Sequence, residues 1–154
     1  MYHLPEFGWW LGELYAGNWH IASYANSMTY FHHAGWQGTV RLRTDQNGAP
    51  IGGEQFTSLP FGDALSADGA TPSHFTDQTH DAESGLEHFL FRQYGSAQGR
   101  WMTPDPAGMA AVDPTNPQTW NRYAYVMNTP VNAIDPLGLE TCPDGSHASV
   151  CVTA

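Results

Sequence analysis

Hydrophobic and polar positions in the middle of the chain alternate in the way that half-buried β-strands require. Residues 39–44 read Thr-Val-Arg-Leu-Arg-Thr, in which apolar and polar side chains alternate. Residues 28–33 combine β-branched and aromatic side chains, which suit a pleated surface. We expect further strands at 56–59, 86–94 and 100–102. The pattern therefore predicts a mainly β fold built from short strands.

Turn-forming residues recur between these expected strands. A strand is followed by Asp or Tyr and then, after a short gap, by Gly, at 45–48, 81–85, 94–99 and 135–138. Such self-similarity is typical of a strip of antiparallel hairpins, none of which can bury its apolar face alone. An ordinary small β-domain with well-formed turns explains the pattern equally well, and both interpretations stay open.

The remaining segments lack this alternation. Residues 106–119 form a Pro-rich loop, and the aromatic stretch after it predicts a short helical segment near residues 120–127, with a strand as the alternative. Residues 1–27 are rich in Gly, Trp and Tyr, and we assign them no secondary structure. The chain divides into this N-terminal segment, a central unit at 28–139 and a flexible polar tail at 140–154.

The composition places aromatic rings where most proteins place aliphatic side chains. Leu, Ile, Val and Phe make up 26 of 154 residues, a share at which a chain of net charge −10 is first suspected of disorder. Six Trp, seven Tyr and seven Phe argue against disorder, because each ring can bury about 150–250 Å². We therefore expect an ordered interior made of rings and turns.

The charge argues against two classes of partner. The chain has no Lys and five Arg, against 15 carboxylates. A field of this sign repels phosphate backbones and anionic lipid, and no apolar run approaches the ~20 residues of a membrane span. We expect neither nucleic acid nor a membrane as a partner. The first six residues also lack the cationic start and apolar core of a secretion signal.

Both cysteines, Cys142 and Cys151, lie near the C-terminus. They are either two free thiols or a disulfide that closes a small loop. Such a loop adds roughly 2–3 kcal/mol, and only in an oxidising compartment. The sequence leaves both readings open.

A run of histidines and carboxylates is the one candidate for metal binding. It comprises His74, Asp77, His80, Asp81 and His88, to which His32 and His33 could add ligands. The spacing fits no zinc pattern, and surface histidines are the ordinary expectation for an acidic chain. We therefore expect no metal. We expect no other cofactor either, because the Gly pair at 52–53 has no phosphate-binding Lys.

A series of motifs resembles a known family. They are LRTDQNG at 42–48, PFG at 60–62, DAESGL at 81–86, RQY at 92–94, TPDP at 103–106, NRYAYV at 121–126, NTPVN at 128–132 and DPLGL at 135–139. In order and spacing they resemble the core-associated end of bacterial RHS (rearrangement hot spot) proteins, whose Tyr-Asp repeats are shared with the teneurin shell. The stretches at 32–39 and 77–80 depart from that family's pattern.

The resemblance implies a fold and a role. In this family a long β-strip spirals into a hollow shell around a C-terminal effector, often a toxin, and the core-associated segment plugs one end. The plug cuts the chain just after its DPxGL motif, which here is the bond between Leu139 and Glu140. The family's proposed catalytic groups fall on Arg92, Asp105 and Asp135. The implied partners are the chain's own upstream repeats or another RHS chain, and the implied location is bacterial secreted or cell-surface.

One arginine and two aspartates are a sufficient kit for aspartic-type peptide hydrolysis. Two neighbouring carboxylates cannot both ionise easily, so one acts as base and the other keeps a proton to donate. A guanidinium can hold one of them ionised or stabilise an oxyanion. The ordinary alternatives are that Asp105 and Asp135 only start Asp-Pro turns, and that Arg92 packs on its ring neighbours Phe89, Phe91 and Tyr94.

The length is the largest departure from the family. A shell needs far more repeats than 154 residues supply, and a lone strip exposes unpaired strand edges. We therefore expect the end piece of a longer shell protein. The segment after Leu139 has 15 residues, too few for a folded effector. The competing hypothesis is a non-catalytic structural or interaction module that docks on another repeat protein.

Overall fold

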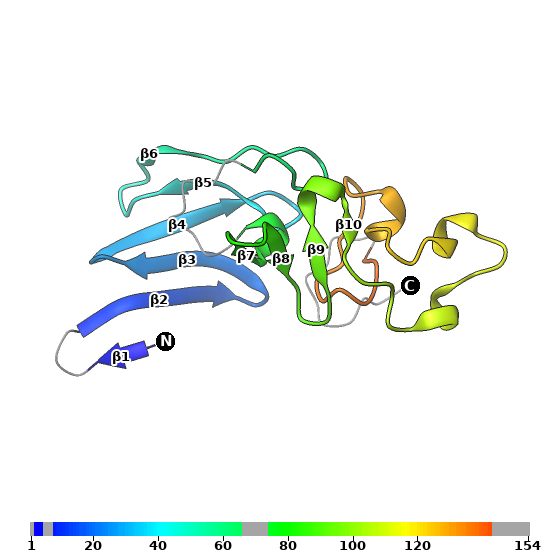
Figure 1. Ribbon diagram of the computed structural model, residues 1–154. Helices are drawn as coiled ribbons and strands as arrows, with labels where there is room; N and C mark the ends of the chain where they lie inside the picture. Colours follow the sequence, from blue (N-terminus) through cyan, green and yellow to red (C-terminus); the bar gives the residue numbers. More distant parts are fainter. Residues whose placement is uncertain (1, 5–7, 66–73, 143–154) are drawn as a thin grey trace.

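The computed structural model describes residues 2–4, 8–65 and 74–142, and they form two antiparallel sheets (Figure 1). The larger sheet has six strands in the order of the sequence. They are β1 (Tyr2–Leu4), β2 (Gly8–Ala16), β3 (Trp19–Ala25), β4 (Met28–Ala34), β5 (Val40–Thr44) and β6 (Pro50–Gln55). The strands expected at 28–33 and 39–44 are confirmed as β4 and β5. Residues 1–27, which had no assignment, supply three strands of the same sheet.

Short turns with positive φ join these strands. Asn26 and Ser27 both adopt positive φ (51° and 62°) between β3 and β4, which is the signature of a two-residue hairpin turn. Between β5 and β6, the Asp45 carboxylate accepts the backbone N–H groups of Asn47 and Ala49 at 2.8 and 2.9 Å. The turns expected at the recurring Asp and Gly residues are therefore present, and they connect consecutive strands into a β-meander.

The smaller sheet carries the second half of the chain. Its strands are β7 (Thr79–Asp81), β8 (Leu86–His88), β9 (Gln93–Gly95) and β10 (Arg100–Trp101). Single 3-10 turns surround them: η1 (Phe75–Asp77), η2 (Ser96–Gln98), η3 (Gly108–Ala111), η4 (Pro117–Trp120) and η5 (Val126–Asn128). The helical character expected near 120–127 is present as η4 and η5, which flank an irregular stretch. None of the described helical turns has the length and apolarity that crossing a membrane requires.

Two of the expected strands are wrong. Residues 56–59 have no regular structure, and the strand of that hairpin is β6, immediately before them. The apolar run at 86–94 is not one strand, because the chain turns at 89–92, where the Phe89 N–H donates to the Arg92 carbonyl at 3.1 Å. That turn leaves Leu90 and Phe91 exposed while Phe89 faces the interior. A continuous apolar stretch therefore contains a hairpin.

The main core is a cluster of aromatic rings beneath the smaller sheet. The buried members are Phe75, Phe89, Tyr94, Trp101 and Tyr125, with Val126 and Ala133 beside them. The ring centroids of neighbouring pairs lie 4.8 to 6.5 Å apart, mostly tilted or edge-to-face. These geometries are the favourable ones for aromatic pairs. The expectation of an interior built from rings is confirmed.

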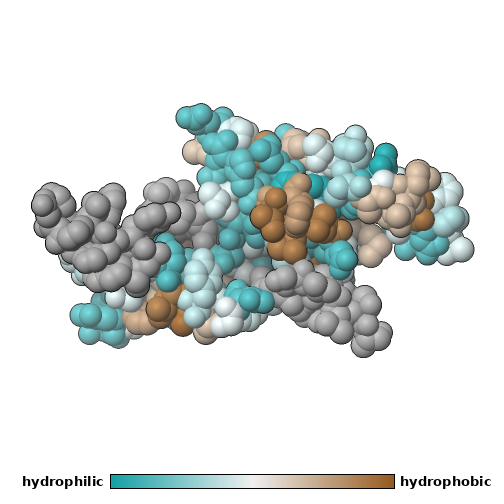
Figure 2. All heavy atoms as spheres, turned by 90° about the horizontal axis from the view of Figure 1, so that it is seen from below, coloured by the Kyte–Doolittle hydropathy of each residue, from teal (hydrophilic) through white to brown (hydrophobic). Residues whose placement is uncertain are grey.

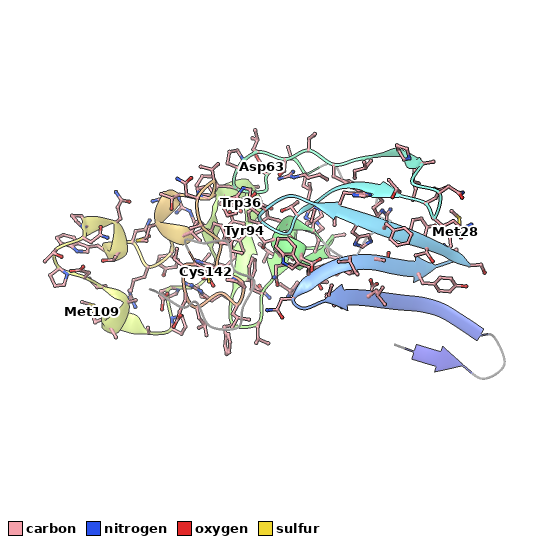
Figure 3. The ribbon with its side chains drawn as sticks, turned by 180° about the vertical axis from the view of Figure 1, so that it is seen from behind. Met28, Trp36, Asp63, Tyr94, Met109 and Cys142 are labelled. Atoms are coloured by element: carbon pink, nitrogen blue, oxygen red, sulfur yellow. The ribbon has the colours of Figure 1, made fainter. Side chains whose placement is uncertain are left out.

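The turn η1 connects the two sheets. Its Thr76 N–H is hydrogen-bonded to the Thr39 hydroxyl at 3.0 Å. Its Asp77 carboxylate contacts His20 Nδ1 of β3 at 3.1 Å, while His20 Nε2 contacts the Glu13 carboxylate at 2.6 Å. Met28 and Met109 lie at opposite ends of the molecule and Tyr94 lies between them (Figure 3). The fold is therefore elongated, with its core near the junction.

The described part of the tail begins inside the fold. Cys142 is fully buried and its backbone exchanges two hydrogen bonds with Ile134, at 2.6 and 3.1 Å. Cys142 is disulfide-bonded. Cys151, and the rest of the tail expected to be flexible, lie outside the described residues.

A glycine under the aromatic core offers a stability test. Gly62 has φ +86°, and a Cβ there would lie 2.5 Å from the Phe75 ring, whereas Gly48 has φ +78° and no atom within 4 Å. Gly62→Ala and Gly48→Ala share the strain of positive φ, so only Gly62→Ala adds overpacking of about 1–3 kcal/mol. We expect Gly62→Ala to lower the urea midpoint well below that of Gly48→Ala. Equal midpoints would contradict this packing.

A buried histidine predicts how stability depends on pH. Burial lowers the pKa of His32 to about 4, and His20 and Arg43 act in the same direction. Below about pH 6.5 the histidine of the unfolded chain becomes protonated, whereas native His32 stays neutral down to about pH 4. The free energy of unfolding is therefore highest above about pH 6.5 and falls as the pH drops toward 4. We expect the wild type to lose stability relative to His32→Gln when urea unfolding is compared at about pH 7 and pH 5. If the difference in unfolding free energy between the wild type and His32→Gln is the same at both pH values, this prediction is wrong.

Candidate functional site

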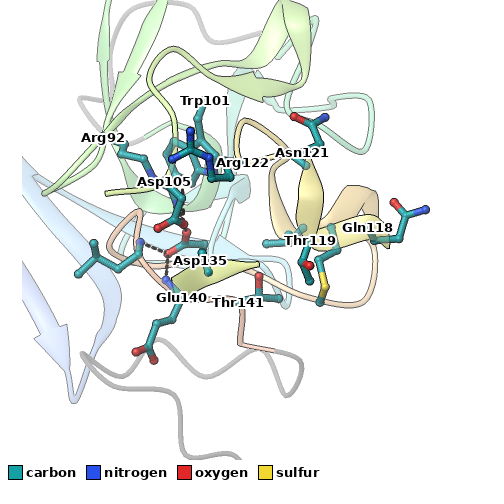
Figure 4. A pocket seen from close by; sticks show the side chains of 15 residues that line it. Arg92, Trp101, Asp105, Gln118, Thr119, Asn121, Arg122, Asp135, Glu140 and Thr141 are labelled. Carbon is teal, nitrogen blue, oxygen red and sulfur yellow. Dashed lines mark hydrogen bonds and ion pairs between the residues drawn. The ribbon is translucent and has the colours of Figure 1, made fainter. Parts of the chain in front are cut away.

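A buried arginine binds both aspartates that the sequence singled out. Arg92 is the last residue of the 89–92 turn and is 6% exposed. Its Nη1 lies 3.3 Å from Asp105 Oδ2, and its Nη2 lies 3.1 Å from Asp135 Oδ2. Its Nε donates to the Gly138 carbonyl at 2.6 Å. Segments 13 and 43 residues further along the chain thus meet on one guanidinium (Figure 4).

Asp135 organises the backbone around the bond that the resemblance marks for cleavage. Its side chain is buried, and Oδ1 accepts three backbone N–H groups, from Gly138 at 2.8 Å, Leu139 at 2.9 Å and Glu140 at 3.2 Å. The Glu140 nitrogen is the amine of the Leu139–Glu140 peptide bond. One carboxylate therefore contacts the guanidinium through one oxygen and that amide through the other.

Gly138 is required by this geometry. Its φ is +80°, and a Cβ at this position would lie 3.3 Å from both the backbone nitrogen and the Cβ of Arg92. A side chain there would be strained and would press on the arginine backbone. The glycine thus lets the turn that begins at Asp135 approach Arg92 closely enough to form the Nε hydrogen bond.

Asp105 is the more accessible of the two carboxylates. Its Oδ1 accepts the Ala107 N–H at 2.9 Å, and its own N–H donates to the Arg122 carbonyl at 2.9 Å. Oδ2 faces Arg92, and the side chain is 15% exposed against 4% for Asp135. In Figure 4 the two carboxyl groups point toward one another. Asp105 is therefore the member that water reaches more readily.

A cavity of about 350 Å³ opens onto these groups. Its lining includes Arg92, Asp105, Asp135, Leu139 and Glu140, so the acids and the marked peptide bond border one space (Figure 4). The Ile134–Cys142 pairing closes the loop that carries this bond. The bond is thus held at both ends beside water-accessible volume.

Burial shifts the pKa values of Asp135 and Arg92. Burial raises the pKa of Asp135 above its usual value, although the three backbone N–H groups and Arg92 oppose this rise. Burial also lowers the pKa of Arg92, and both carboxylates oppose that change. A guanidinium stays protonated at physiological pH even so. One cation thus faces two acids, of which Asp135 is the more buried.

The structure brings together the three predicted site residues and corrects one detail. Arg92 does pack on a ring, but that ring is Trp101, whose centroid lies 4.2 Å from the guanidinium carbon, and not one of the neighbours in sequence. Trp101 lies nine residues downstream in β10, so no local pattern pointed to it. It also belongs to the aromatic core, which therefore supports the guanidinium directly.

Comparison with known proteins places part of the chain among RHS-associated proteins. No family model matches. The chain is 42% identical to toxin protein Tse5 of Pseudomonas aeruginosa over 71 residues, which are 46% of this chain and 5% of Tse5. It is 39% identical to the probable deoxyribonuclease RhsA of Dickeya dadantii over 75 residues, 49% of this chain and 5% of RhsA. The chain thus spans about a twentieth of the length of these relatives.

Solved structures support the fold over more of the chain. A TcdB2-TccC3 structure without its hypervariable C-terminal region matches 84% of this chain and 6% of its own, with a TM-score of 0.68 and 23% identity. The Photorhabdus luminescens Tc holotoxin pore matches 94% of this chain and 7% of its own, with a TM-score of 0.63 and 21% identity. The mainly β architecture therefore recurs in these much longer chains.

Asp105 and Asp135 differ in burial and in the number of backbone N–H groups that they accept, so their substitution is expected to destabilise the fold to different extents. Asp135→Asn weakens the buried contact with Arg92 and the acceptor of three N–H groups, whereas Asp105→Asn alters a more exposed group. Breaking a buried pair costs about 3–5 kcal/mol, and partial exposure reduces that cost at Asp105. We expect Asp135→Asn to unfold at clearly lower urea than Asp105→Asn. Equal or reversed midpoints would contradict the assigned contacts.

Proposed function

Because this chain carries an RHS-related core segment, we propose that it is the end plug of an RHS-type β-shell and that it cuts its own backbone after Leu139. The observation that carries the proposal is the contact of Asp135 with both Arg92 and the Glu140 amide. A general acid must reach the leaving nitrogen, and Asp135 Oδ1 lies 3.2 Å from it.

The proposed reaction is hydrolysis of one peptide bond. Asp105 takes a proton from a water molecule in the cavity, and the water oxygen attacks the Leu139 carbonyl carbon. Asp135 gives its proton to the Glu140 nitrogen as the carbon–nitrogen bond breaks, which leaves a carboxyl group on Leu139 and an amine on Glu140. Arg92, whose Nη1 lies 3.3 Å from Asp105 Oδ2, stabilises the charge that develops beside it.

The raised pKa of Asp135 suits its proposed role as the acid. Burial favours the protonated carboxyl, while the more exposed Asp105 supplies the base. The substrate is the chain itself, and the loop closed at Ile134 and Cys142 carries a bond that Asp135 contacts, with Asp105 lining the same cavity. Such intramolecular placement lowers the barrier without a separate binding step.

The same proposal names the partners. The plug packs against the chain's own upstream shell repeats or another RHS chain, and cleavage frees a C-terminal effector inside the shell. Among the described residues β1 and β6 are the outer strands of the larger sheet, which supports this, because an unpaired edge is a template for further strands. The chain's net charge of −10 argues against nucleic acid as a partner. We propose a secreted or cell-surface location for the whole assembly.

A non-catalytic docking module is the second candidate. The observation in its favour is that Asp105 and Asp135 both accept backbone N–H groups of their own turns, which is what purely structural aspartates do. Figure 2 also shows a compact hydrophobic patch on a face that is otherwise largely polar. In this reading the carboxylates only shape loops that present a surface to another repeat protein.

Intact mass under denaturing conditions separates the two candidates. We expect the purified chain to yield the fragment 1–139 and the 15-residue peptide 140–154. Denaturation is needed because the Ile134–Cys142 pairing would hold the cut peptide in place. We expect Asp105→Asn and Asp135→Asn to stay whole, with cleavage reduced by at least about 10²-fold, the lower end of what general acid–base groups contribute.

Asp113→Asn is the matched control. Asp113 also precedes a proline, but it is exposed and caps Thr115 at 2.8 Å. Its substitution therefore tests the loss of an Asp-Pro turn without touching Arg92. We expect the Asp113→Asn chain to be cut like the wild type. A wild-type chain that remains whole for days, or equal cutting in all three variants, would leave the docking module as the better account.

A further inference from the structure

A second cluster of ionisable side chains lies on the smaller sheet, away from Arg92. His80 of β7 and Glu87 of β8 are directly opposite in the antiparallel register, so their side chains leave the sheet on the same face. His74, in the segment that leads into η1, reaches the same point. One ligand atom from each of the three lies within 4.8 Å of the other two.

Glu87 is the unusual member of this cluster. It is fully buried, and both imidazoles contact the same oxygen, His74 Nδ1 at 2.6 Å and His80 Nδ1 at 3.1 Å from Oε1. Among the described residues, Oε2 is buried and has no hydrogen-bond partner. A buried carboxylate with an unused oxygen is costly unless a cation compensates it.

We propose that His74, His80 and Glu87 bind one divalent transition-metal ion, with zinc as the best fit. Two imidazole nitrogens and one carboxylate oxygen are ligands that zinc accepts at about 2.0–2.2 Å, with a fourth position left for water. Imidazole suits zinc and disfavours magnesium and calcium. His80 is 30% exposed at its side chain, so the ion and its water have a path to the site.

The binding geometry needs only small movements. Ligand atoms around a tetrahedral zinc ion lie about 3.3 Å apart, slightly further than the present 2.6 and 3.1 Å contacts. The His74 and His80 rings are stacked with centroids 4.2 Å apart and planes at 28°.

This inference reverses the expectation from the sequence, which considered the histidines without Glu87. The structure separates the other residues of that run. Asp77 contacts His20 at 3.1 Å, and Asp81 Oδ2 accepts the Ser84 hydroxyl while it lies 3.9 Å from His88. The pairing of β7 with β8 brings His80 and Glu87 together, and the spacing of residues along the sequence does not reveal this pairing. The inference is independent of the proposed self-cleavage.

Zinc titration of the untagged chain after chelator treatment tests the site. Calorimetry is expected to show one zinc ion bound per chain, and magnesium is expected not to bind. We expect His80→Gln to weaken zinc binding by more than the about 10–100-fold that loss of an outer-shell partner costs. His88 follows Glu87 in β8, so its side chain leaves the sheet on the opposite face, and it is 44% exposed. His88→Gln is therefore expected to bind zinc like the wild type.

Thermal unfolding gives a second readout. Zinc that binds only the folded chain raises the unfolding midpoint of the wild type and of His88→Gln, and leaves that of His80→Gln unmoved. Glu87→Gln, which keeps the shape of the buried side chain, is expected to behave like His80→Gln. The proposal is overturned if the wild type shows no saturable binding at micromolar zinc, or if His80→Gln binds zinc as tightly as His88→Gln.

Discussion

The contact of one buried guanidinium with two carboxylates is the interaction on which the second half of the structure depends. Arg92 joins the turn before β9, the loop at Asp105 and the turn that begins at Asp135. The Phe91 N–H also donates to the Leu137 carbonyl at 3.1 Å, and together with this bond the arginine and its acids hold the three segments together. A buried cation without such partners would be strongly destabilising. The contact that joins these segments is therefore also the one on which the proposed cleavage rests.

The aromatic core and the site form one unit. Trp101 packs edge-to-face with Phe89 and Tyr94 and also contacts the Arg92 guanidinium. Large rings suit a chain of short strands and many turns, because few side chains then bury much apolar surface. A rigid ring beneath the guanidinium also limits its rotation. Loss of packing in the core is thus expected to loosen the site.

Much of the architecture was predictable, for reasons that are local. Alternation and β-branched residues marked β4 and β5, and the recurrent Asp and Gly marked the turns. The prediction of one strand at 86–94 was wrong because periodicity alone does not distinguish a single apolar strand from a hairpin whose turn residues are apolar. Arg92 and its two aspartates came from motif resemblance, whereas Trp101 and the partnership of Glu87 with two histidines depend on tertiary contacts. Those contacts leave no pattern in the sequence.

The central claim is that Asp105 and Asp135 direct water to the Leu139 carbonyl. Incubation of the freshly made chain in ¹⁸O-labelled water, followed by denaturing mass spectrometry of the fragments, tests it most directly. The account predicts a cut between Leu139 and Glu140, with one heavy oxygen in the new Leu139 carboxyl group. An uncut chain, an unlabelled fragment, or a cut at the acid-labile Asp135–Pro136 bond would contradict it.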